Sequence, residues 1–193
     1  MQAPPTRRQW IADNGMQVTI RPITAEDRDI ELAFVRGLSP DSRYFRFLST
    51  IKDLTPQLLD RFTQVDFPGE MALIATIPTG TAEQEIGVAR YAQGNAPGTV
   101  EFAIVIADTW QGQGIGRELL RHLFNVAEEV GHQRIEGVAL KANTKMLRLA
   151  RELRFAVDPY PGDAGLVRLG KDIQSRSERP AMGHDNPTTS NTK

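Results

Sequence analysis

The fold is decided by the stretch Trp110-Gln111-Gly112-Gln113-Gly114-Ile115-Gly116-Arg117, a glycine-rich loop that opens directly into a long amphipathic helix. The residues before it, Val100-Glu101-Phe102-Ala103-Ile104-Val105-Ile106-Ala107, have the composition of a β-strand. A strand, a glycine-rich loop and a helix N-terminus together present backbone N–H groups and a positive helix end to a phosphate. A side chain on any of the three loop glycines would keep a ligand's oxygens away from the main chain. The sequence therefore predicts a site for an anionic, phosphate-bearing cofactor.

Two common phosphate-binding patterns are excluded by the residues of this loop. No Gly-Lys-Ser/Thr follows the glycines, so the loop is not of the Walker type. The dinucleotide-binding fingerprint would need its third glycine where Arg117 or Leu119 stands. The remaining pattern is Gln-x-x-Gly-x-Gly, formed by Gln111, Gly114 and Gly116 after a strand.

This spacing resembles the acetyl-CoA loop of the GNAT acyltransferase superfamily. Residues 138–143, Val-Ala-Leu-Lys-Ala-Asn, and residues 146–155 resemble the next strand of the family, its asparagine and its last helix. Residues 20–23, 38–47 and 70–75 look like the catalytic domain of Pat-type bacterial protein lysine acetyltransferases. The resemblance extends over residues 16–171, which is nearly the whole of the expected folded region.

The resemblance implies an α/β (α+β) fold of the GNAT type. Its central sheet is expected to be mixed and mostly antiparallel, with six to seven strands and about four flanking helices. We expect a flexible N-terminus over residues 1–15 and a GNAT acetyltransferase domain over residues 16–173. From about Gln174 the composition turns to Ser, Arg, Pro, Asn and Thr, which predicts a disordered C-terminal tail over residues 174–193.

The bulk composition excludes several other classes of protein. A net charge of −1 gives no electrostatic reason to expect nucleic acid as a partner. The absence of cysteine excludes disulfides and thiolate zinc sites, and three scattered histidines argue against any metal. No run reaches the roughly 18 apolar residues of a membrane span, and the start of the chain lacks the apolar core of a signal peptide. We expect a cytoplasmic monomer or homodimer without a membrane partner.

The implied activity is N-acetyl transfer from acetyl-CoA to a primary amine. Such a transfer needs a neutral amine against the carbonyl, a base that takes its proton and a donor for the oxyanion. A lysine amine is neutral to only about one part in a thousand at pH 7, so the base decides much of the rate. A protein lysine is the preferred acceptor. A small amine (a polyamine, an aminoglycoside or an amino acid) and a non-catalytic acetyl-CoA-binding sensor stay open as alternatives.

The resemblance assigns roles to residues on both sides of the loop. Glu101 is the candidate general base, because relatives that acetylate lysines often place a glutamate on this strand; the alternative is a strand glutamate that faces solvent. Backbone groups of Ile104, Val105 and Ile106 would pair with the pantetheine arm, and an N–H near Ile106 could polarise the thioester carbonyl. The residues expected to hold the rest of the cofactor are Gln111, Gly112, Gln113, Gly114, Ile115, Gly116, Arg117 and Asn143.

Three assignments keep a structural alternative. Arg117 could bind phosphate or be a solvated surface arginine. Asn143 could be the N-cap of the following helix, a cofactor contact or both. The aromatic residues of 43–47 are typical of core, but the family uses this helix to line the acceptor groove. Arg90 is interpreted as an ordinary strand charge.

Two positions depart from the family pattern. The tyrosine that many relatives use as general acid to the leaving thiolate is Ala150 here, and the usual glycine before Phe155 is Arg154. Without that tyrosine the thiolate must take a proton from water or from the attacking amine, or leave unprotonated.

Overall fold

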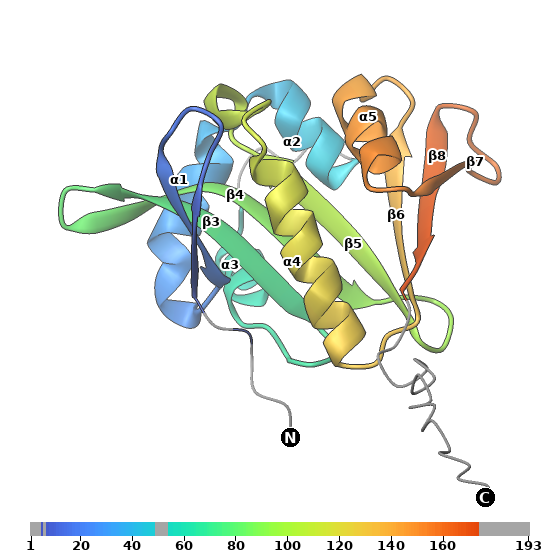
Figure 1. Ribbon diagram of the computed structural model, residues 1–193, viewed down its shortest axis with the longest axis horizontal. Helices are drawn as coiled ribbons and strands as arrows, with labels where there is room; N and C mark the ends of the chain where they lie inside the picture. Colours follow the sequence, from blue (N-terminus) through green and yellow to red (C-terminus); the bar gives the residue numbers. More distant parts are fainter. Residues whose placement is uncertain (1–4, 6, 49–53, 174–193) are drawn as a thin grey trace, which may run out of the picture.

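The computed structural model describes residue 5 and residues 7–48 and 54–173. An eight-stranded sheet runs through it in the order β1-β2-β3-β4-β5-β6-β8-β7 (Figure 1). Every neighbouring pair is antiparallel except β5 and β6, which are parallel. The strands are β1 Arg8–Ile11, β2 Gln17–Pro22, β3 Met71–Thr79, β4 Ala82–Gln93, β5 Thr99–Ile106, β6 Arg134–Leu140, β7 Ala156–Pro159 and β8 Leu166–Asp172.

Helices cover both faces of this sheet. Within the described ranges the α-helices are α1 Arg28–Gly37, α2 Pro40–Phe47, α3 Pro56–Thr63, α4 Ile115–Glu129 and α5 Thr144–Glu152, and the short 3-10 helices are η1 Ala25–Asp27 and η2 Asp108–Trp110. Helix α4 crosses one face, and α1, α2 and α3 lie behind the other (Figure 1). The expected mixed, mostly antiparallel sheet flanked by helices is confirmed, with one strand more than the largest number predicted.

The additional strand is β1, which corrects the prediction of a flexible segment over residues 1–15. Arg8–Ile11 pairs with β2 in the register Arg8↔Ile20 to Ile11↔Gln17. The side chain of Trp10 packs against the main hydrophobic core, and burial of such a large aromatic group favours an ordered strand. The predicted tail at residues 174–193 lies outside the described residues, as do residues 1–4 and 6.

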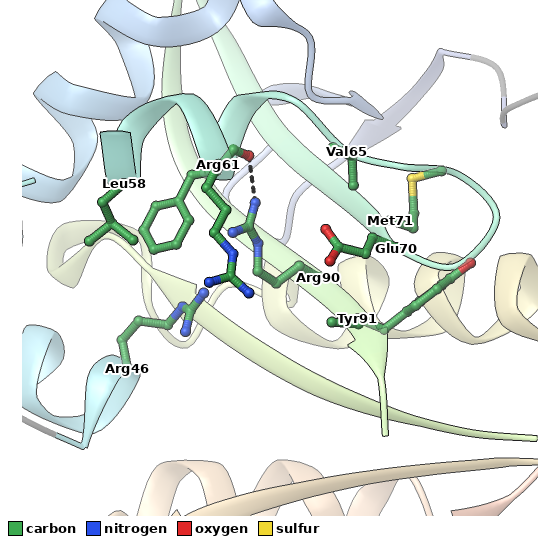
Figure 2. A pocket seen from close by; sticks show the side chains of 10 residues that line it. Arg46, Leu58, Arg61, Val65, Glu70, Met71, Arg90 and Tyr91 are labelled. Carbon is green, nitrogen blue, oxygen red and sulfur yellow. Dashed lines mark hydrogen bonds between the residues drawn. The ribbon is translucent and has the colours of Figure 1, made fainter. Parts of the chain in front are cut away.

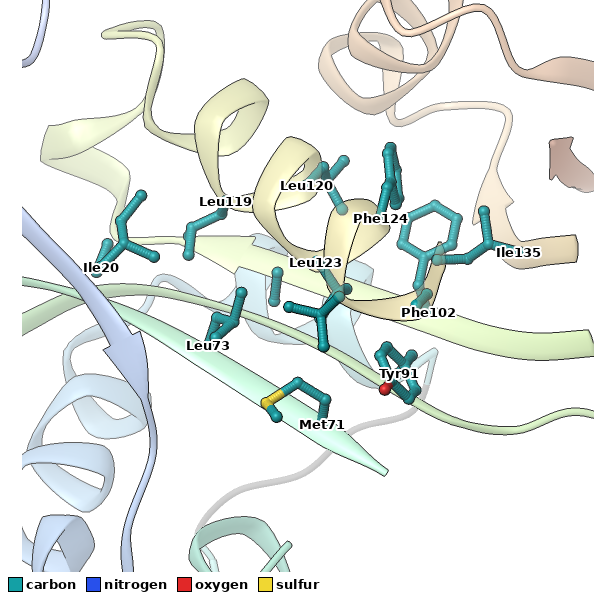
Figure 3. Packing of buried hydrophobic residues seen from close by; sticks show 14 of the residues in the cluster. Ile20, Met71, Leu73, Tyr91, Phe102, Leu119, Leu120, Leu123, Phe124 and Ile135 are labelled. Atoms are coloured by element: carbon teal, nitrogen blue, oxygen red, sulfur yellow. The ribbon is translucent and has the colours of Figure 1, made fainter. Parts of the chain in front are cut away.

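Helix α4 attaches to the sheet through a buried apolar stripe. Leu119, Leu120 and Leu123 are 0% exposed, as their helical spacing predicted. Figure 3 shows these residues above Leu73 of β3 and Phe102 of β5. This packing holds the N-terminus of α4 in place at the end of β5.

An aromatic cluster fixes β5 and β6 relative to α4. The ring of Phe102 lies 6.2 Å from that of Phe124 on α4 and 5.2 Å from that of Phe155, measured between centroids. A Cβ at Gly137 of β6 would come within 2.7 Å of the Phe102 ring. Glycine at this position therefore lets β6 lie beside the aromatic ring where the two parallel strands meet.

Candidate active site

The two parallel strands at the centre of the sheet separate soon after they meet. Their paired residues are Thr99↔Arg134, Val100↔Ile135 and Glu101↔Glu136, and the ladder ends there. On its other edge β5 stays paired with β4 as far as Ile106. The second half of β5 therefore has one edge that faces a gap instead of a strand.

The hydrogen-bond alternation of β5 decides which backbone groups face this gap. The N–H of Ala107 donates to the carbonyl of Ile86 on β4, at 2.9 Å. In an antiparallel pair, alternate residues direct both backbone groups to the same neighbour. Val105 therefore faces β4, while Ile104 and Ile106 direct their N–H and C=O groups to the gap. Of the three residues predicted to pair with an extended ligand, Ile104 and Ile106 have the suitable orientation and Val105 does not.

The loop between β5 and α4 has a backbone that favours glycine at two positions. Gly112 has a φ of +79° and Gly114, the N-cap of α4, a φ of +80°. A Cβ on Gly114 would lie 3.2 Å from the Trp10 ring, and one on Gly116 would lie 3.3 Å from Leu149 of α5. A Cβ on Gly112 would meet nothing within 4 Å in the protein. Close packing thus favours glycine at Gly114 and Gly116, while the space beside Gly112 is open to a ligand.

The remaining loop residues are held by the protein's own contacts. The side-chain Nε2 of Gln113 donates to the carbonyl of Thr109 at 3.1 Å, and the backbone carbonyl of Gln113 accepts from the N–H of Asp13 at 3.4 Å. The side chain of Ile115 is 1% exposed and belongs to the core. Ile115 can therefore reach a ligand only through its backbone N–H, in the first turn of α4.

The predicted cofactor residue Gln111 connects three elements around the gap. Its Nε2 donates to the carbonyl of Ile106 at 3.1 Å and to the hydroxyl of Ser42 on α2 at 3.2 Å. Its Oε1 accepts from Nζ of Lys145, in the first turn of α5, at 2.7 Å. These bonds show a structural role for Gln111 that its place in the motif did not indicate.

A second connection to α2 comes from Asp108, which the sequence analysis did not single out. Its carboxylate accepts from the N–H of Ser39 at 2.9 Å and from the hydroxyls of Ser39 and Ser42, each at 2.8 Å. Partial burial acts to raise the pKa of Asp108, but these hydrogen bonds outweigh it and lower the pKa below its usual range. No local pattern in the sequence predicts this contact, because Ser39 and Ser42 lie more than sixty residues before Asp108 in the chain.

Arg117 and Asn143 each have a structural partner. Nη2 of Arg117 lies 3.2 Å from Oε2 of Glu152, an exposed ion pair between α4 and α5. Oδ1 of Asn143 accepts from the N–H of Met146 at 3.0 Å, which confirms the N-cap of α5. Ala150, at the position of the family tyrosine, is 0% exposed.

The cap on α5 leads to a test. Asn143→Ala should destabilise the protein by about 1 kcal/mol, because the Met146 N–H loses its side-chain acceptor. Asn143→Ser restores an acceptor and should recover most of that loss in thermal unfolding. Equal melting temperatures for wild type and Asn143→Ala would mean that the cap contributes nothing to stability.

The candidate base lies where the parallel ladder ends. Glu101 is exposed, stands opposite Ala92 of β4 and neighbours Glu136 of β6 in register. No hydrogen bond to the Glu101 side chain occurs within the described ranges, whereas Glu136 accepts from Nε of Arg134 at 2.6 Å. Glu101 therefore has an uncommitted carboxylate beside the gap, on the face covered by α1, α2 and α3.

A pair of buried carboxyls lies deeper on the same face. Glu31 of α1 is 2% exposed and Glu85 of β4 is 3% exposed, and both oxygens of Glu85 lack a hydrogen-bond partner among the described residues. Burial raises the pKa of Glu31. Burial and the neighbouring Glu31 raise the pKa of Glu85 well above its ordinary value.

The raised pKa of Glu85 has a consequence for stability. A carboxyl whose pKa is higher in the folded state than in the unfolded state destabilises the fold at high pH. The loss of stability begins as the pH rises above the unfolded-state pKa of about 4.5 and is complete above the folded-state pKa. Glu85→Gln should therefore raise the free energy of unfolding near pH 8 by about 1–3 kcal/mol, with no gain near pH 4. Unfolding curves at both pH values would measure the difference.

Glu83, two residues earlier on β4, is the matched control. Burial acts to raise its pKa, but its ion pair with Arg21 outweighs burial and lowers the pKa. A carboxyl whose pKa is lowered by folding stabilises the fold at pH values above its unfolded-state pKa. This stabilisation is lost as the pH falls through the folded-state pKa. Glu83→Gln should thus reduce stability near pH 8, opposite in sign to Glu85→Gln, and the same sign for both would contradict the assignment.

The described ranges contain no cluster of three or more His, Cys, Asp or Glu side chains that could hold a metal ion. No helix there is both long enough and apolar enough to cross a bilayer.

Comparison with known proteins identifies similar sequences and structures. Residues 17–156 match the family model described as an acetyltransferase (GNAT) domain. An acetyltransferase of Pseudomonas aeruginosa is 39% identical over 160 residues, which span 82% of this chain and 86% of the relative. Acetyltransferase Pat of Mycolicibacterium smegmatis is 30% identical over 135 residues, or 69% of this chain and 40% of that longer protein.

A solved structure agrees with these matches. The GNAT domain of S. lividans PAT superposes with a TM-score of 0.79 at 29% identity, covering 86% of this chain and 97% of that one. The similarity in sequence thus extends to the arrangement of strands and helices around the gap.

Proposed function

This chain belongs to the GNAT acetyltransferase family and is an acyltransferase, and on that premise we propose that it transfers the acetyl group of acetyl-CoA to a lysine amine of a protein, with Glu101 as general base. The family uses acetyl-CoA as its donor. The observation that carries the proposal is the open edge of β5, which leads directly into the glycine loop and the N-terminus of α4.

The residues around the gap fit this donor. Ile104 offers a backbone donor and acceptor to an extended amide-bearing arm, as a neighbouring strand would, and Ile106 offers its backbone N–H. Backbone N–H groups from Gly112 to Arg117 would hold the diphosphate, aided by the positive end of α4. The Ile106 N–H is the candidate donor to the thioester oxygen. Asn143 and Lys145 lie in the adjoining first turn of α5.

The proposed chemistry is direct attack by the amine. Glu101 takes a proton from the incoming ammonium group, and the neutral amine attacks the thioester carbon. The tetrahedral intermediate then loses the second proton of its nitrogen to water and collapses; the C–S bond breaks, the neutral amide forms, and coenzyme A leaves as a thiolate, which takes a proton from water. Ala150 is buried and carries no acid, so no side chain at that position protonates the sulfur.

Similarity to the Pat proteins supports a protein lysine as acceptor. The test is release of free thiol from acetyl-CoA with lysine peptides, compared with polyamines, aminoglycosides and amino acids. Turnover with peptides above the small amines supports the proposal. Turnover only with small amines would reject a protein acceptor. Tight binding of acetyl-CoA without turnover of any amine would reject the catalytic role.

The acceptor proteins can be sought directly. Lysates incubated with the enzyme and isotopically labelled acetyl-CoA should contain labelled lysines that mass spectrometry can locate. A lysate incubated with labelled acetyl-CoA but without the enzyme provides the background of non-enzymatic acetylation, and labelling at equal levels with and without the enzyme would contradict enzyme-dependent transfer.

A further inference from the structure

A pocket lined by three arginines lies on the same face of the sheet as Glu101. Its volume is about 180 Å³, and its charged lining consists of Arg46 of α2, Arg61 of α3, Arg90 of β4 and Glu70. Figure 2 shows the three guanidinium groups directed toward one another. We call this site the arginine pocket.

Arg46 and Arg90 are held by aromatic and backbone contacts instead of ion pairs. The guanidinium of Arg46 stacks 5.0 Å from the ring centroid of Phe47, and that of Arg90 lies 4.5 Å from the ring of Phe62. Nη2 of Arg90 donates to the carbonyl of Phe62 at 2.6 Å. No carboxylate in the described part of the chain lies within ion-pairing distance of either Arg46 or Arg90.

The surrounding acids compensate these positive charges only in part. Glu70 lines the pocket, and burial lowers the pKa of Arg90 although the charges of Glu31, Glu70 and Glu85 act to raise it. The pKa values of Glu31 and Glu85 are raised, which favours their neutral forms and weakens this compensation. Burial and the charge of Arg90 lower the pKa of Arg46 to about 10, so Arg46 is still positive at neutral pH. An added anion would relieve the repulsion between the arginines.

The register of β4 and β5 places this pocket beside the candidate base. Ala92, which lines the pocket, stands directly opposite Glu101. Arg90 is two residues before Ala92 on the same face, so it is a diagonal neighbour of Glu101, and residues in such a pair lie about 7–8 Å apart. A group bound between the arginines would therefore lie within a few bonds of an amine positioned at Glu101.

We propose that the arginine pocket binds a carboxylate of the acceptor, held by Arg46 and Arg90, and so selects amines that carry an acidic group nearby. The planar guanidinium presents paired donors that match the two oxygens of a carboxylate. The carboxylate is either an acidic side chain close to the target lysine or the α-carboxylate of a C-terminal lysine. This proposal rests on the proposed acetyl transfer to lysine and specifies the class of acceptor.

The test uses lysine peptides that differ only in charge. One set carries glutamate or glutamine at each position from one to three residues on either side of the lysine. A second set ends in lysine as the free acid or as the amide, which separates a side-chain carboxylate from an α-carboxylate. We expect kcat/KM to be about tenfold higher for the acidic member of the pair that fits, as a charge-assisted hydrogen bond is lost in its neutral partner.

Variants connect the preference to the pocket. Arg46→Gln and Arg90→Gln should each remove the preference for the acidic peptide while leaving acetyl-CoA affinity unchanged, and Arg46→Lys should keep part of it. Arg8→Gln, which removes a positive charge from the exposed edge strand β1, is the matched control and should retain the full preference. Glutarate should inhibit the wild type competitively against the acidic peptide and inhibit Arg46→Gln more weakly.

The outcomes separate this proposal from the proposed function. Absence of turnover with every peptide would reject lysine acetylation itself. Equal kcat/KM for acidic and neutral peptides in the wild type, with turnover present, would overturn only the carboxylate pocket. That comparison needs no variant, so it holds even if the arginine variants fold poorly. A preference that survives in both glutamine variants would place the carboxylate elsewhere.

Discussion

Glu101→Gln is expected to lower kcat by about 10²- to 10⁴-fold, the range of a lost general base, with no change in the dissociation constant of acetyl-CoA. The amide cannot accept the proton of the incoming ammonium group, and the neutral amine is scarce at pH 7. The side chain is exposed and has nearly the same shape, so the fold should persist. Calorimetry with acetyl-CoA and steady-state rates of thiol release measure the two quantities.

Glu136→Gln is the control for this variant. Glu136 is the register neighbour of Glu101 on β6, but its carboxylate is engaged by Arg134. Removal of this ion pair should change stability by less than about 1 kcal/mol and kcat only slightly. If both glutamine variants kept wild-type kcat, neither carboxylate would be the base. If Glu136→Gln alone lost activity, Glu136 would be the general base instead of Glu101.

Gly114→Ala should weaken acetyl-CoA binding by at least about tenfold and destabilise the fold by about 2–4 kcal/mol. Alanine is strained at a φ of +80°, and its Cβ would come 3.2 Å from the Trp10 ring and 3.3 Å from the Asp13 carboxylate. To relieve these contacts the loop must shift, and with it the N–H groups proposed to bind the diphosphate. Thermal unfolding and calorimetry report the two effects separately.

The opposite end of the same helix offers a matched substitution. Gly131 has a φ of +91°, and a Cβ there would meet nothing within 4 Å. Gly131→Ala should therefore show only the backbone strain, about 1–2 kcal/mol, with acetyl-CoA affinity unchanged. An equal loss of affinity in both variants would show that general destabilisation, not the geometry of the loop, causes the effect at Gly114.

Features encoded by neighbouring residues could be predicted from the sequence. The buried stripe of α4 follows from the helical spacing of Leu119, Leu120 and Leu123. The cap at Asn143 and the glycine at the start of α4 also depend on a few adjacent residues. β1 was missed, because Arg8–Ile11 is short and does not alternate, and only its pairing with β2 and the packing of Trp10 make it a strand.

The strand before the loop, the glycine loop and the capped helices could be predicted from the sequence, because they depend on interactions between residues a few positions apart. Only the tertiary structure shows that the parallel ladder ends at Glu101, that Ile104 and Ile106 face the gap, and that Arg46 and Arg90 line one pocket without an ion-pair partner among the described residues. These features depend on strand register and on contacts between residues dozens of positions apart, which no local pattern encodes. The sequence gives the type and charge of each side chain, but the side chains that surround it in space depend on how distant segments of the chain pack together.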